Sequence, residues 1–347
     1  MSLDVNIEKD LGGFRLKACF SAERGVVGLL GASGSGKSMT LKCIAGIERP
    51  DRGRIVLDGV TLFDSERHID LPPQKRQVGY LFQNYALYPH MTVQKNILCG
   101  LHGVRDRAER EARLAEALRI FRLETIADRK PAEISGGQAQ RTAVARILVS
   151  RPKLLMLDEP FSALDSHLRL QLQLELKKTL SAYDGAVLMV THSRDEAYHM
   201  CDAIAIAENG TFAPIRATKP LFADPGSFAA ARLTGCKNLA RAVKTGEREV
   251  FVPEWNVRFT TAQPVCDSLC GVGLRAHYFN PRAAQNSFPV IRVGEMEEPF
   301  EWILLFRYEG QSPDAAPLWW RLPKDKRPQD FPDRLGIAPV NVLLLYE

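Results

Sequence analysis

Residues 28–46, GLLGASGSGKSMTLKCIAG, restrict the possible folds of this chain more than any other segment. An apolar run precedes the glycine-rich loop GASGSGKS, and an amphipathic helical pattern follows it, with the spacing G-x4-G-K-S. Such a loop presents backbone N–H groups and the positive end of a helix to a phosphate. We expect Lys37 to reach the β and γ oxygens of a nucleotide and the Ser38 hydroxyl to help ligate Mg²⁺. The loop residues expected to bind the nucleotide are Gly31, Ser33, Gly34, Gly36, Lys37, Ser38 and Met39.

Two acidic residues end a second apolar run. In KLLMLDEP, Asp158 and Glu159 follow four apolar residues, which places them at the carboxyl end of a buried strand. Ligands bind at this edge in open α/β sheets. We predict that Asp158 holds Mg²⁺ through water and that Glu159 orients or deprotonates the water that attacks the γ-phosphate. A pair of solvated acids that merely open a loop is the alternative, and the phosphate loop in the same sheet disfavours it.

Two more apolar runs end in polar side chains. VLMVTHS places His192 at a strand end, from which its imidazole can reach the γ-phosphate, whereas the other histidines are expected to be ordinary surface or core residues. GYLFQNYALYPHMTV places Gln83 at another strand end, where its amide can contact Mg²⁺ or the attacking water. We therefore predict catalytic roles for His192 and Gln83, and a metal-binding role for Gln83. The loop after Gln83 is expected to face another molecule.

The order of apolar and helical patterns predicts two domains. Up to about residue 234, short apolar runs such as VVGLL and AVLMV alternate with helical patterns, as in an α/β fold with a buried parallel sheet. Between about residues 88 and 152, three helical patterns follow one another without a strand, which predicts an inserted helical subdomain. Residues 235–347 contain short strand patterns separated by turn residues, which predicts a small β-rich domain, either a barrel or a sandwich.

Composition excludes several function classes. The 347 residues are 45% hydrophobic and 25% charged, which suits a globular chain long enough for two domains. A net charge of +5, with basic and acidic residues interspersed, argues against a nucleic-acid partner. Seven scattered cysteines favour a reducing cytoplasm over a disulfide framework. The acidic N-terminus is unlike a secretory signal, and no run reaches the roughly 18 apolar residues of a membrane span, so we expect a soluble chain whose membrane role comes through a partner.

A second glycine pair, in ISGGQ at residues 134–138, also opens a helix, although the phosphate loop is already complete. The motifs GASGSGKS, LFQN, ISGGQAQR, LLMLDEP, SALD and VTHS occur in this order before residue 234. In this set and spacing, the chain resembles the ATP-binding subunits of ABC transporters, whose signature LSGGQ carries Leu where this chain has Ile134. The resemblance implies a P-loop (RecA-like) ATPase core with an inserted helical subdomain, and ATP with Mg²⁺ as its ligands.

The resemblance also implies a head-to-tail pair of two copies, in which the signature of one copy grips the γ-phosphate held by Lys37 of the other. The signature residues given this role are Ser135, Gly136, Gly137 and Gln138, and Asp165 of SALD would lie on the shared interface. Closure is then favoured while the γ-phosphate is present and lost after hydrolysis. The implied partners are integral membrane permease subunits and, indirectly, an external solute-binding protein, which places the chain on the cytoplasmic face of the membrane as a peripheral protein.

Members of this family usually stack adenine on an aromatic ring from the first strands. Phe14, in the segment GGF, is our candidate for this platform, and a core role for the same side chain remains the alternative. Phe20 reads as a core residue.

The C-terminal domain, which we expect to be OB-like, resembles the regulatory domains of bacterial importer ATPases for sugars, polyamines, sulfate, iron and molybdate. Residues 31–93 look most like the molybdate or sulfate branch, and TGCKNLARA is similar to the start of the molybdate-type domain. The implied function is import of molybdate or a related oxyanion such as tungstate or sulfate, with another solute as the alternative. In GLRAHYF, Arg275 and His277 can donate to a tetrahedral oxyanion, although an ordinary strand is the favoured interpretation.

Two other function classes stay open as alternatives. A soluble member of the family that acts on DNA or ribosomes should contain a long coiled-coil insertion or tandem ATPase halves, and the sequence contains neither. A non-catalytic scaffold should have lost Lys37, Glu159 or His192, and all three are present.

Overall fold

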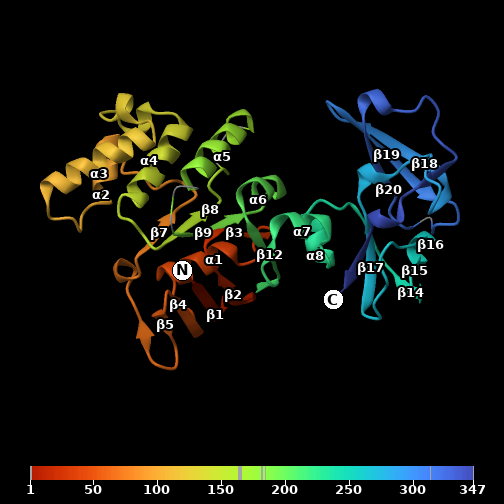
Figure 1. Cartoon of the computed structure of the whole chain (residues 1–347), viewed down its shortest axis with the longest axis horizontal. Coiled ribbons are helices and arrows are strands. Elements are labelled where there is room, and N and C mark those ends of the chain that lie inside the picture. Colours follow the sequence, from red (N-terminus) through yellow and green to blue (C-terminus); the bar gives the residue numbers. More distant parts are fainter. Residues whose placement is uncertain (1, 163–165, 181–182, 184, 313, 347) are drawn as a thin grey trace. The chain divides into compact units, whose positions relative to one another are not determined.

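The computed structural model describes residues 2–162, 166–180, 183, 185–312 and 314–346, apart from the side chains of residues 166–168. The chain divides into two compact units, Met1–Thr218 and Lys219–Glu347. Figure 1 shows the first unit as helices around a sheet and the second as mostly strands.

A mixed sheet organises the first unit. Its strands are β1 (Leu3–Asp10), β2 (Arg15–Ala22), β3 (Gly25–Gly31), β4 (Arg52–Leu57), β5 (Val60–Asp64), β6 (Ile69–Asp70), β7 (Val78–Leu81), β8 (Leu154–Asp158), β9 (Ala186–Thr191), β10 (Ala203–Glu208), β11 (Thr211–Phe212) and β12 (Arg216–Ala217). Within the part of the chain that the structure describes, their order is β6-β5-β4-β1-β2-β11-β10-β3-β9-β8-β7, with β12 also paired to β10. The neighbours β10, β3, β9, β8 and β7 pair in parallel.

Burial along these strands follows their apolar patterns. Every residue of β8 and β9 is buried, as expected for strands that form continuous apolar runs. In β2, by contrast, buried and exposed residues alternate strictly, because only one face of this antiparallel strand packs on the core. The parallel strands therefore form the interior of the unit.

Helices cover the sheet and form a separate group between β7 and β8. The helices of the first unit are α1 (Lys37–Ala45), α2 (Val93–Cys99), α3 (Arg107–Ile120), α4 (Gly136–Leu148), α5 (Ser166–Leu180) and α6 (Arg194–Met200). Polar caps start the helices of this group: the Thr92 side chain accepts from the Lys95 N–H, and Asp106 accepts from the Ala108 N–H. Figure 1 shows α2, α3 and α4 gathered together, away from β1, β4 and β5. The three helical patterns expected between residues 88 and 152 correspond to these helices.

The second unit consists of three antiparallel sheets around one core. Its strands are β13 (Asn238–Arg241), β14 (Val243–Gly246), β15 (Glu249–Val252), β16 (Val257–Thr260), β17 (Leu269–Leu274), β18 (Ser287–Glu297), β19 (Glu301–Tyr308), β20 (Leu318–Pro323), β21 (Arg334–Gly336) and β22 (Val342–Tyr346). Their orders are β13-β17-β22, β14-β15-β16 and β20-β19-β18-β21. Phe259 of β16, Leu274 of β17 and Phe306 of β19 belong to the same buried cluster, so one apolar core joins the three sheets.

Short helices complete both units. Six-residue helices α7 (Thr218–Ala223) and α8 (Phe228–Leu233) follow β12. The 3-10 turns are Pro73–Lys75, Glu124–Ile126, Pro131–Glu133, Pro253–Trp255, Ala276–Tyr278, Lys324–Lys326 and Pro339–Asn341.

The second unit begins before residue 234, where the sequence pattern places the boundary. Phe228 of α8 packs against a buried cluster of Cys236, Leu343 and Leu345, and the Tyr346 N–H donates to the Gly226 carbonyl. Because α8 buries its apolar face on β22, this segment folds with the strands that follow it.

The architecture expected from the sequence is confirmed: an α/β core with a parallel sheet carries a helical insertion and is followed by a β-rich unit. Among the described residues, none of the helices has the length and apolar character needed to cross a membrane.

A buried arginine fixes the helix that follows the glycine loop. Arg76 is 1% exposed, and its guanidinium donates to the carbonyls of Cys43 and Ile44 at the C-terminal end of α1, at 2.8 and 2.9 Å. The same side chain donates to the Leu71 carbonyl at 2.7 Å and to Asp70 at 2.8 Å. It therefore satisfies carbonyls that a helix end leaves unpaired and ties α1 to the segment before β7.

Replacing this arginine should destabilise the first unit. We expect Arg76→Met to leave buried carbonyls without donors and to lower the free energy of unfolding by at least about 2 kcal/mol. The matched control is Arg54→Met, because Arg54 is half exposed and its ion pair with Asp64 is long, at 3.7 Å. That control should change stability by less than about 0.5 kcal/mol. Urea unfolding followed by circular dichroism measures both, and equal losses would contradict the assignment of Arg76 as the anchor of α1.

Candidate active site

Register places the candidate residues at one edge of the parallel sheet. Leu30 of β3 pairs with Thr191 of β9, and Val190 of β9 pairs with Asp158 of β8. Leu81 of β7 pairs with Leu157 of β8. The glycine loop, Glu159, His192 and Gln83 each follow one of these strand ends within two residues. They therefore start from neighbouring positions along the carboxyl edge, where α/β folds bind ligands.

The glycine loop leads directly from β3 into α1. A Cβ atom at Gly31 would lie 2.3 Å from the Ala207 carbonyl oxygen, so only glycine lets β3 pass β10 at this point. Gly36 is the N-cap of α1 with a φ of 95°, in the left-handed region that favours glycine. Ser33 and Gly34 between them are exposed. The loop therefore presents its backbone to the surface at the positive end of α1.

Lys37 lies folded into this loop. Its side chain is 4% exposed, and its Nζ donates to the carbonyls of Gly31 and Ala32 at 2.9 and 2.7 Å. Burial lowers the pKa of this amine, while the nearby charges of Glu159 and Asp158 act in the opposite direction. The amine is thus held next to the same two carboxylates that end β8.

Asp158 links the loop to two strands through both of its carboxylate oxygens. Ser38 Oγ donates to Asp158 Oδ1 at 2.7 Å, and Tyr80 Oη donates to Asp158 Oδ2 at 2.7 Å. Burial and the adjacent Asp158 carboxylate raise the pKa of the Tyr80 phenol, so Tyr80 remains a donor. No local sequence pattern points to Tyr80. Its contact depends on the parallel register that pairs Tyr80 with Met156, which puts residues 80 and 158 on the same face of the sheet.

Glu159 and His192 form the second close pair. The Glu159 Oε1 and His192 Nδ1 atoms are 3.2 Å apart, with the carboxylate side chain 19% and the imidazole 53% exposed. Glu159 has a φ of 46°, which is uncommon for a residue other than glycine, and its N–H donates to the Val190 carbonyl at 3.1 Å. This backbone turn directs the carboxylate away from β8 and toward the imidazole at the end of β9.

Gln83 lies on the surface two residues after β7. Among the described residues, no hydrogen bond or ion pair connects it to Asp158 or Glu159. In the loop that follows, Tyr85 is buried, whereas Tyr88 is 46% exposed beneath the Arg146 guanidinium, which lies 5.7 Å from the ring centre. The loop therefore both packs on the helical group and presents an aromatic side chain outward.

The signature forms the N-terminus of α4. Ser135 is the N-cap: its Oγ accepts from the Gln138 N–H at 3.3 Å, and its own N–H donates to Gln138 Oε1 at 2.9 Å. Ser135 and Gly136 are exposed, and Gly137 is buried. Within the part of the chain that the structure describes, no hydrogen bond or ion pair joins Ser135–Gln138 to Lys37, Asp158 or Glu159. The glycine loop and the signature thus form two separate helix N-termini, those of α1 and α4.

Phe14 lies beside the glycine loop. Two atoms of its ring lie 3.4 Å from the position that a Cβ at Gly36 would occupy, and the partly buried ring also packs against the core. Phe20 is a core residue, with its ring centre 5.5 Å from that of Phe212. Met39 of α1 is partly buried and packs against the same core. Asp165 lies outside the described residues.

In the second unit, Arg275 donates hydrogen bonds mainly to backbone carbonyls. Its guanidinium donates to the Thr234 carbonyl at 2.8 Å, to Thr234 Oγ1 at 3.3 Å and to the Phe222 carbonyl. His277 is exposed and lies in a 3-10 turn, with its ring centre 4.2 Å from that of Tyr278. The donors of Arg275 are therefore engaged by the segment that contains α7 and α8, and a structural role accounts for this residue.

The oxygen atoms beside the glycine loop suit a small divalent cation that takes most of its ligands from water and phosphate. The described residues contain no group of three or more His, Cys, Asp or Glu that could hold a metal by itself. Ser38 and Asp158 present oxygen atoms 2.7 Å apart at the loop. Mg²⁺ typically takes one or two protein oxygens and completes its shell with water and phosphate, so this pair suits it.

Comparison with known proteins identifies the family. The family model described as ABC transporter matches residues 19–162. A molybdenum import ATP-binding protein, ModC, of Paramagnetospirillum magneticum is 38% identical over 65% of this chain and 61% of its own length. A molybdate/tungstate import ATP-binding protein, WtpC, of Archaeoglobus fulgidus is 42% identical over 64% of this chain and 90% of its own. A spermidine/putrescine import ATP-binding protein, PotA, of Bacillus cereus is 41% identical over 68% of this chain and 69% of its own.

A solved structure agrees with this result. The ATP-binding cassette MJ0796, in a dimeric post-hydrolysis state bound to ADP and Pi, matches 63% of this chain and 99% of its own, with a TM-score of 0.51 and 28% identity. Sequence and fold comparisons converge on one family. The chain therefore belongs to the ABC transporter family, among its ATP-binding proteins.

Proposed function

We propose that this chain binds ATP with Mg²⁺ and hydrolyses it to power an importer in a membrane. The observation that carries the proposal is the cluster at the carboxyl edge of the sheet: Ser38 and Asp158 at 2.7 Å, and Glu159 and His192 at 3.2 Å, around the glycine loop. Two of the relatives align with less than 70% of their own lengths, so activity, solute and partners are inferred from this cluster together with the family.

Each residue has a chemical task in the proposed reaction. Backbone N–H groups of residues 31–39 cradle the phosphates, and Lys37 turns from the loop carbonyls toward the β and γ oxygens. Ser38 and Asp158, with Gln83, would hold Mg²⁺, which would supply positive charge beside the phosphates. Glu159 orients the attacking water and accepts its proton, while His192 positions this carboxylate and contacts the γ-phosphate. Phe14 stacks on adenine beside Gly36.

We further propose that two copies form the working unit. The exposed N-terminus of α4 is an anion site without a phosphate loop of its own, and a γ-phosphate held by a second copy would satisfy Ser135, Gly136, Gly137 and Gln138. The dimeric assemblies of MJ0796 favour this arrangement. Asp165 would lie on the same interface, as the family resemblance implies.

Membrane permease subunits are the proposed partners of the loop after Gln83. The exposed ring of Tyr88 on the helical group suits a groove that receives a helix from another protein. We accordingly propose that the chain acts at the cytoplasmic face of the membrane as a peripheral protein, with an external solute-binding protein acting indirectly. We propose the first unit, Met1–Thr218, as the ATP-binding domain, with its helical subdomain at about 88–152, and the second unit, Lys219–Glu347, as the regulatory domain.

For the solute, we propose molybdate or a related oxyanion. The names of two relatives support this choice, whereas the polyamine importer PotA of Bacillus cereus supports a polyamine as the second candidate. Since Arg275 is engaged by backbone carbonyls, any regulatory oxyanion site in the second unit should use other donors.

Two substitutions separate nucleotide binding from chemistry. Glu159→Gln should keep ATP affinity within about threefold and lower kcat at least about 100-fold, because the amide cannot accept the proton of the attacking water. Lys37→Ala should weaken ATP binding itself, because it removes the cation from the phosphate loop. Equilibrium binding of ATP and steady-state hydrolysis measure the two effects. Near wild-type hydrolysis by the Gln variant would remove Glu159 from the reaction.

Solute uptake tests the proposed specificity. A strain that lacks this chain should lose uptake of labelled molybdate and recover it with the wild-type chain. The Lys37→Ala chain should fail to restore it. Putrescine uptake in the same strains is the control and should stay unchanged. Loss and recovery of putrescine uptake, with molybdate uptake unaffected, would instead assign the chain to the polyamine importers.

A further inference from the structure

The carbonyl of Pro160 joins three separate parts of the first unit. Pro160 directly follows Glu159, and its carbonyl oxygen accepts from Gln140 Nε2 of α4 at 3.0 Å and from Tyr85 Oη at 3.3 Å. Both donors are buried, with Gln140 only 3% exposed. A helix of the inserted group and the loop after Gln83 therefore meet at the residue next to the proposed catalytic carboxylate.

The helix α4 also holds this loop directly. Arg146 Nη1 donates to the Ala86 carbonyl at 2.8 Å, and Arg146 Nη2 donates to the Tyr85 carbonyl at 2.9 Å. Tyr85 and Ala86 have φ values of 58° and 45°, so the backbone turns sharply around the guanidinium. Gln140 and Arg146 thus lie on one helix, and they fix the Glu159 turn and the loop after Gln83 respectively.

Within the described part of the chain, a small set of other hydrogen bonds holds the Glu159 turn. Proline has no N–H, so the polar backbone group of Pro160 is its carbonyl. On its other side the turn is held by the Glu159 N–H, which donates to the Val190 carbonyl at 3.1 Å. Ser162 also holds it, because its N–H and its Oγ donate to the Glu159 carbonyl at 3.2 and 3.0 Å. A backbone with φ at 46° persists only where its surroundings hold it. The hydrogen bond from Gln140 supplies part of that support from the direction of α4.

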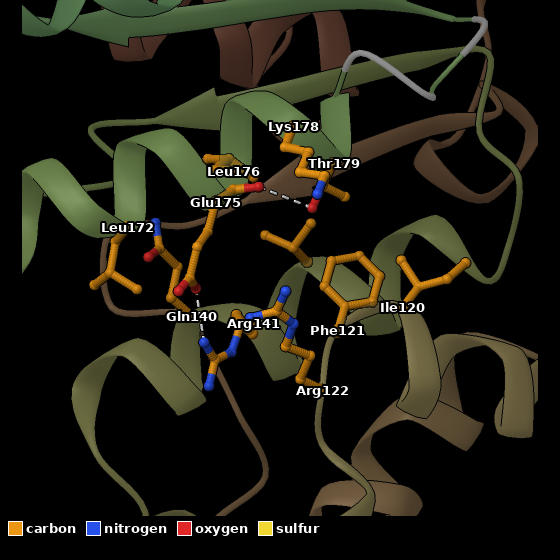
Figure 2. A pocket seen from close by; sticks show the side chains of 11 residues that line it. Ile120, Phe121, Arg122, Gln140, Arg141, Leu172, Glu175, Leu176, Lys178 and Thr179 are labelled. Atoms are coloured by element: carbon orange, nitrogen blue, oxygen red, sulfur yellow. Dashed lines mark hydrogen bonds and ion pairs between the residues drawn. The ribbon is translucent and has the colours of Figure 1, made fainter.

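Packing between α4 and α5 is open beside Gln140. A pocket of about 290 Å³ lies there, and Gln140, Phe121, Leu172 and Leu176 are among the residues that line it (Figure 2). An ion pair between Arg141 and Glu175, at 2.7 Å, crosses from α4 to α5 at the same pocket. Apolar packing is incomplete on this face of α4. Polar contacts therefore contribute more to fixing where α4 lies relative to the sheet.

We propose that Gln140 is a positioning residue that couples the signature end of α4 to the direction of the Glu159 carboxylate. Ser135 and Gln140 are five residues apart, about 7.5 Å along the helix, so a shift of the signature end moves the Gln140 amide with it. The amide then pulls the Pro160 carbonyl and, through one peptide unit, the Glu159 turn. The inference rests on the proposed function, because it assumes that Glu159 acts on the attacking water.

The main test replaces the amide by an apolar side chain of similar size. Gln140→Met should lower kcat for ATP hydrolysis at least about tenfold, because the Glu159 carboxylate is no longer held in the direction of the attacking water. It should leave KM for ATP within about twofold. If Gln140 acts through Glu159, adding Gln140→Met to the Glu159→Gln chain should lower the residual rate by less than about twofold. Tyr85→Phe, which removes the other donor and keeps the ring, should lower kcat in the same direction by a smaller factor.

Thr142→Val is the matched control. Thr142 lies on the same helix, is buried, and its hydroxyl donates within the helix to the Gln138 carbonyl at 2.7 Å. The substitution therefore removes a buried hydrogen bond of α4 that does not reach Pro160. Its kcat should stay within about twofold of wild type.

Hydrogen exchange gives a readout that does not depend on ATP. In the nucleotide-free protein, Gln140→Met should speed amide exchange at Glu159 and Ser162 at least about tenfold relative to Thr142→Val. Three results would each overturn the proposal. They are an unchanged kcat in Gln140→Met, a tenfold loss of rate when Gln140→Met is added to the Glu159→Gln chain, and unchanged exchange at these amides. A wild-type chain that never hydrolyses ATP would refute the proposed function instead, and the exchange result would still decide whether Gln140 holds the turn.

Discussion

The rest of the site depends on the two hydrogen bonds that the Asp158 carboxylate accepts. One oxygen accepts from Ser38 at the start of α1 and the other from Tyr80 of β7, both at 2.7 Å. β8 lies between β7 and β9, so a single side chain fixes the phosphate loop and the neighbouring strand against the centre of the sheet. Because Glu159 is the next residue, its position is set by the same anchor. A charged acceptor suits this task, since hydrogen bonds to charged groups contribute about 1.5–3 kcal/mol each.

Apart from Asp158, the site is held in place by side chains that donate hydrogen bonds to backbone carbonyls. Arg76 holds the far end of α1, Gln140 holds the Pro160 carbonyl, and Arg146 holds the loop after Gln83. All three are side chains that donate to carbonyls exposed by helix ends or sharp turns. Such turns are where a nucleotide site needs precise geometry, and their polar groups cannot remain unpaired when buried.

The parts of the candidate site that follow from local pattern are predictable from the sequence. Apolar runs indicated β3, β8 and β9, and the polar residues after them do lie along one edge. Tyr80 and Gln140 were not found, because their roles depend on register and on the packing of α4, which no local pattern encodes. Arg275 is a possible anion ligand by sequence, whereas in the structure its guanidinium donates to the carbonyls of residues 222 and 234, which are distant in sequence. The C-terminal strands were recognised from turn residues, but the start of that unit was placed late because α8 packs on strands that follow it.

The central claim is that each nucleotide is gripped by the phosphate loop of one copy and the signature of another. The direct measurement is ATP hydrolysis by a mixture of two inactive chains, Lys37→Ala and Ser135→Arg, in which mixed dimers are verified by differential tags. A mixed dimer then has one composite site with both lesions and one with neither. At equal, random mixing, hydrolysis should return to about one quarter of the wild-type rate if the two sites act independently. Verified mixed dimers that hydrolyse no faster than either variant alone would contradict the shared site.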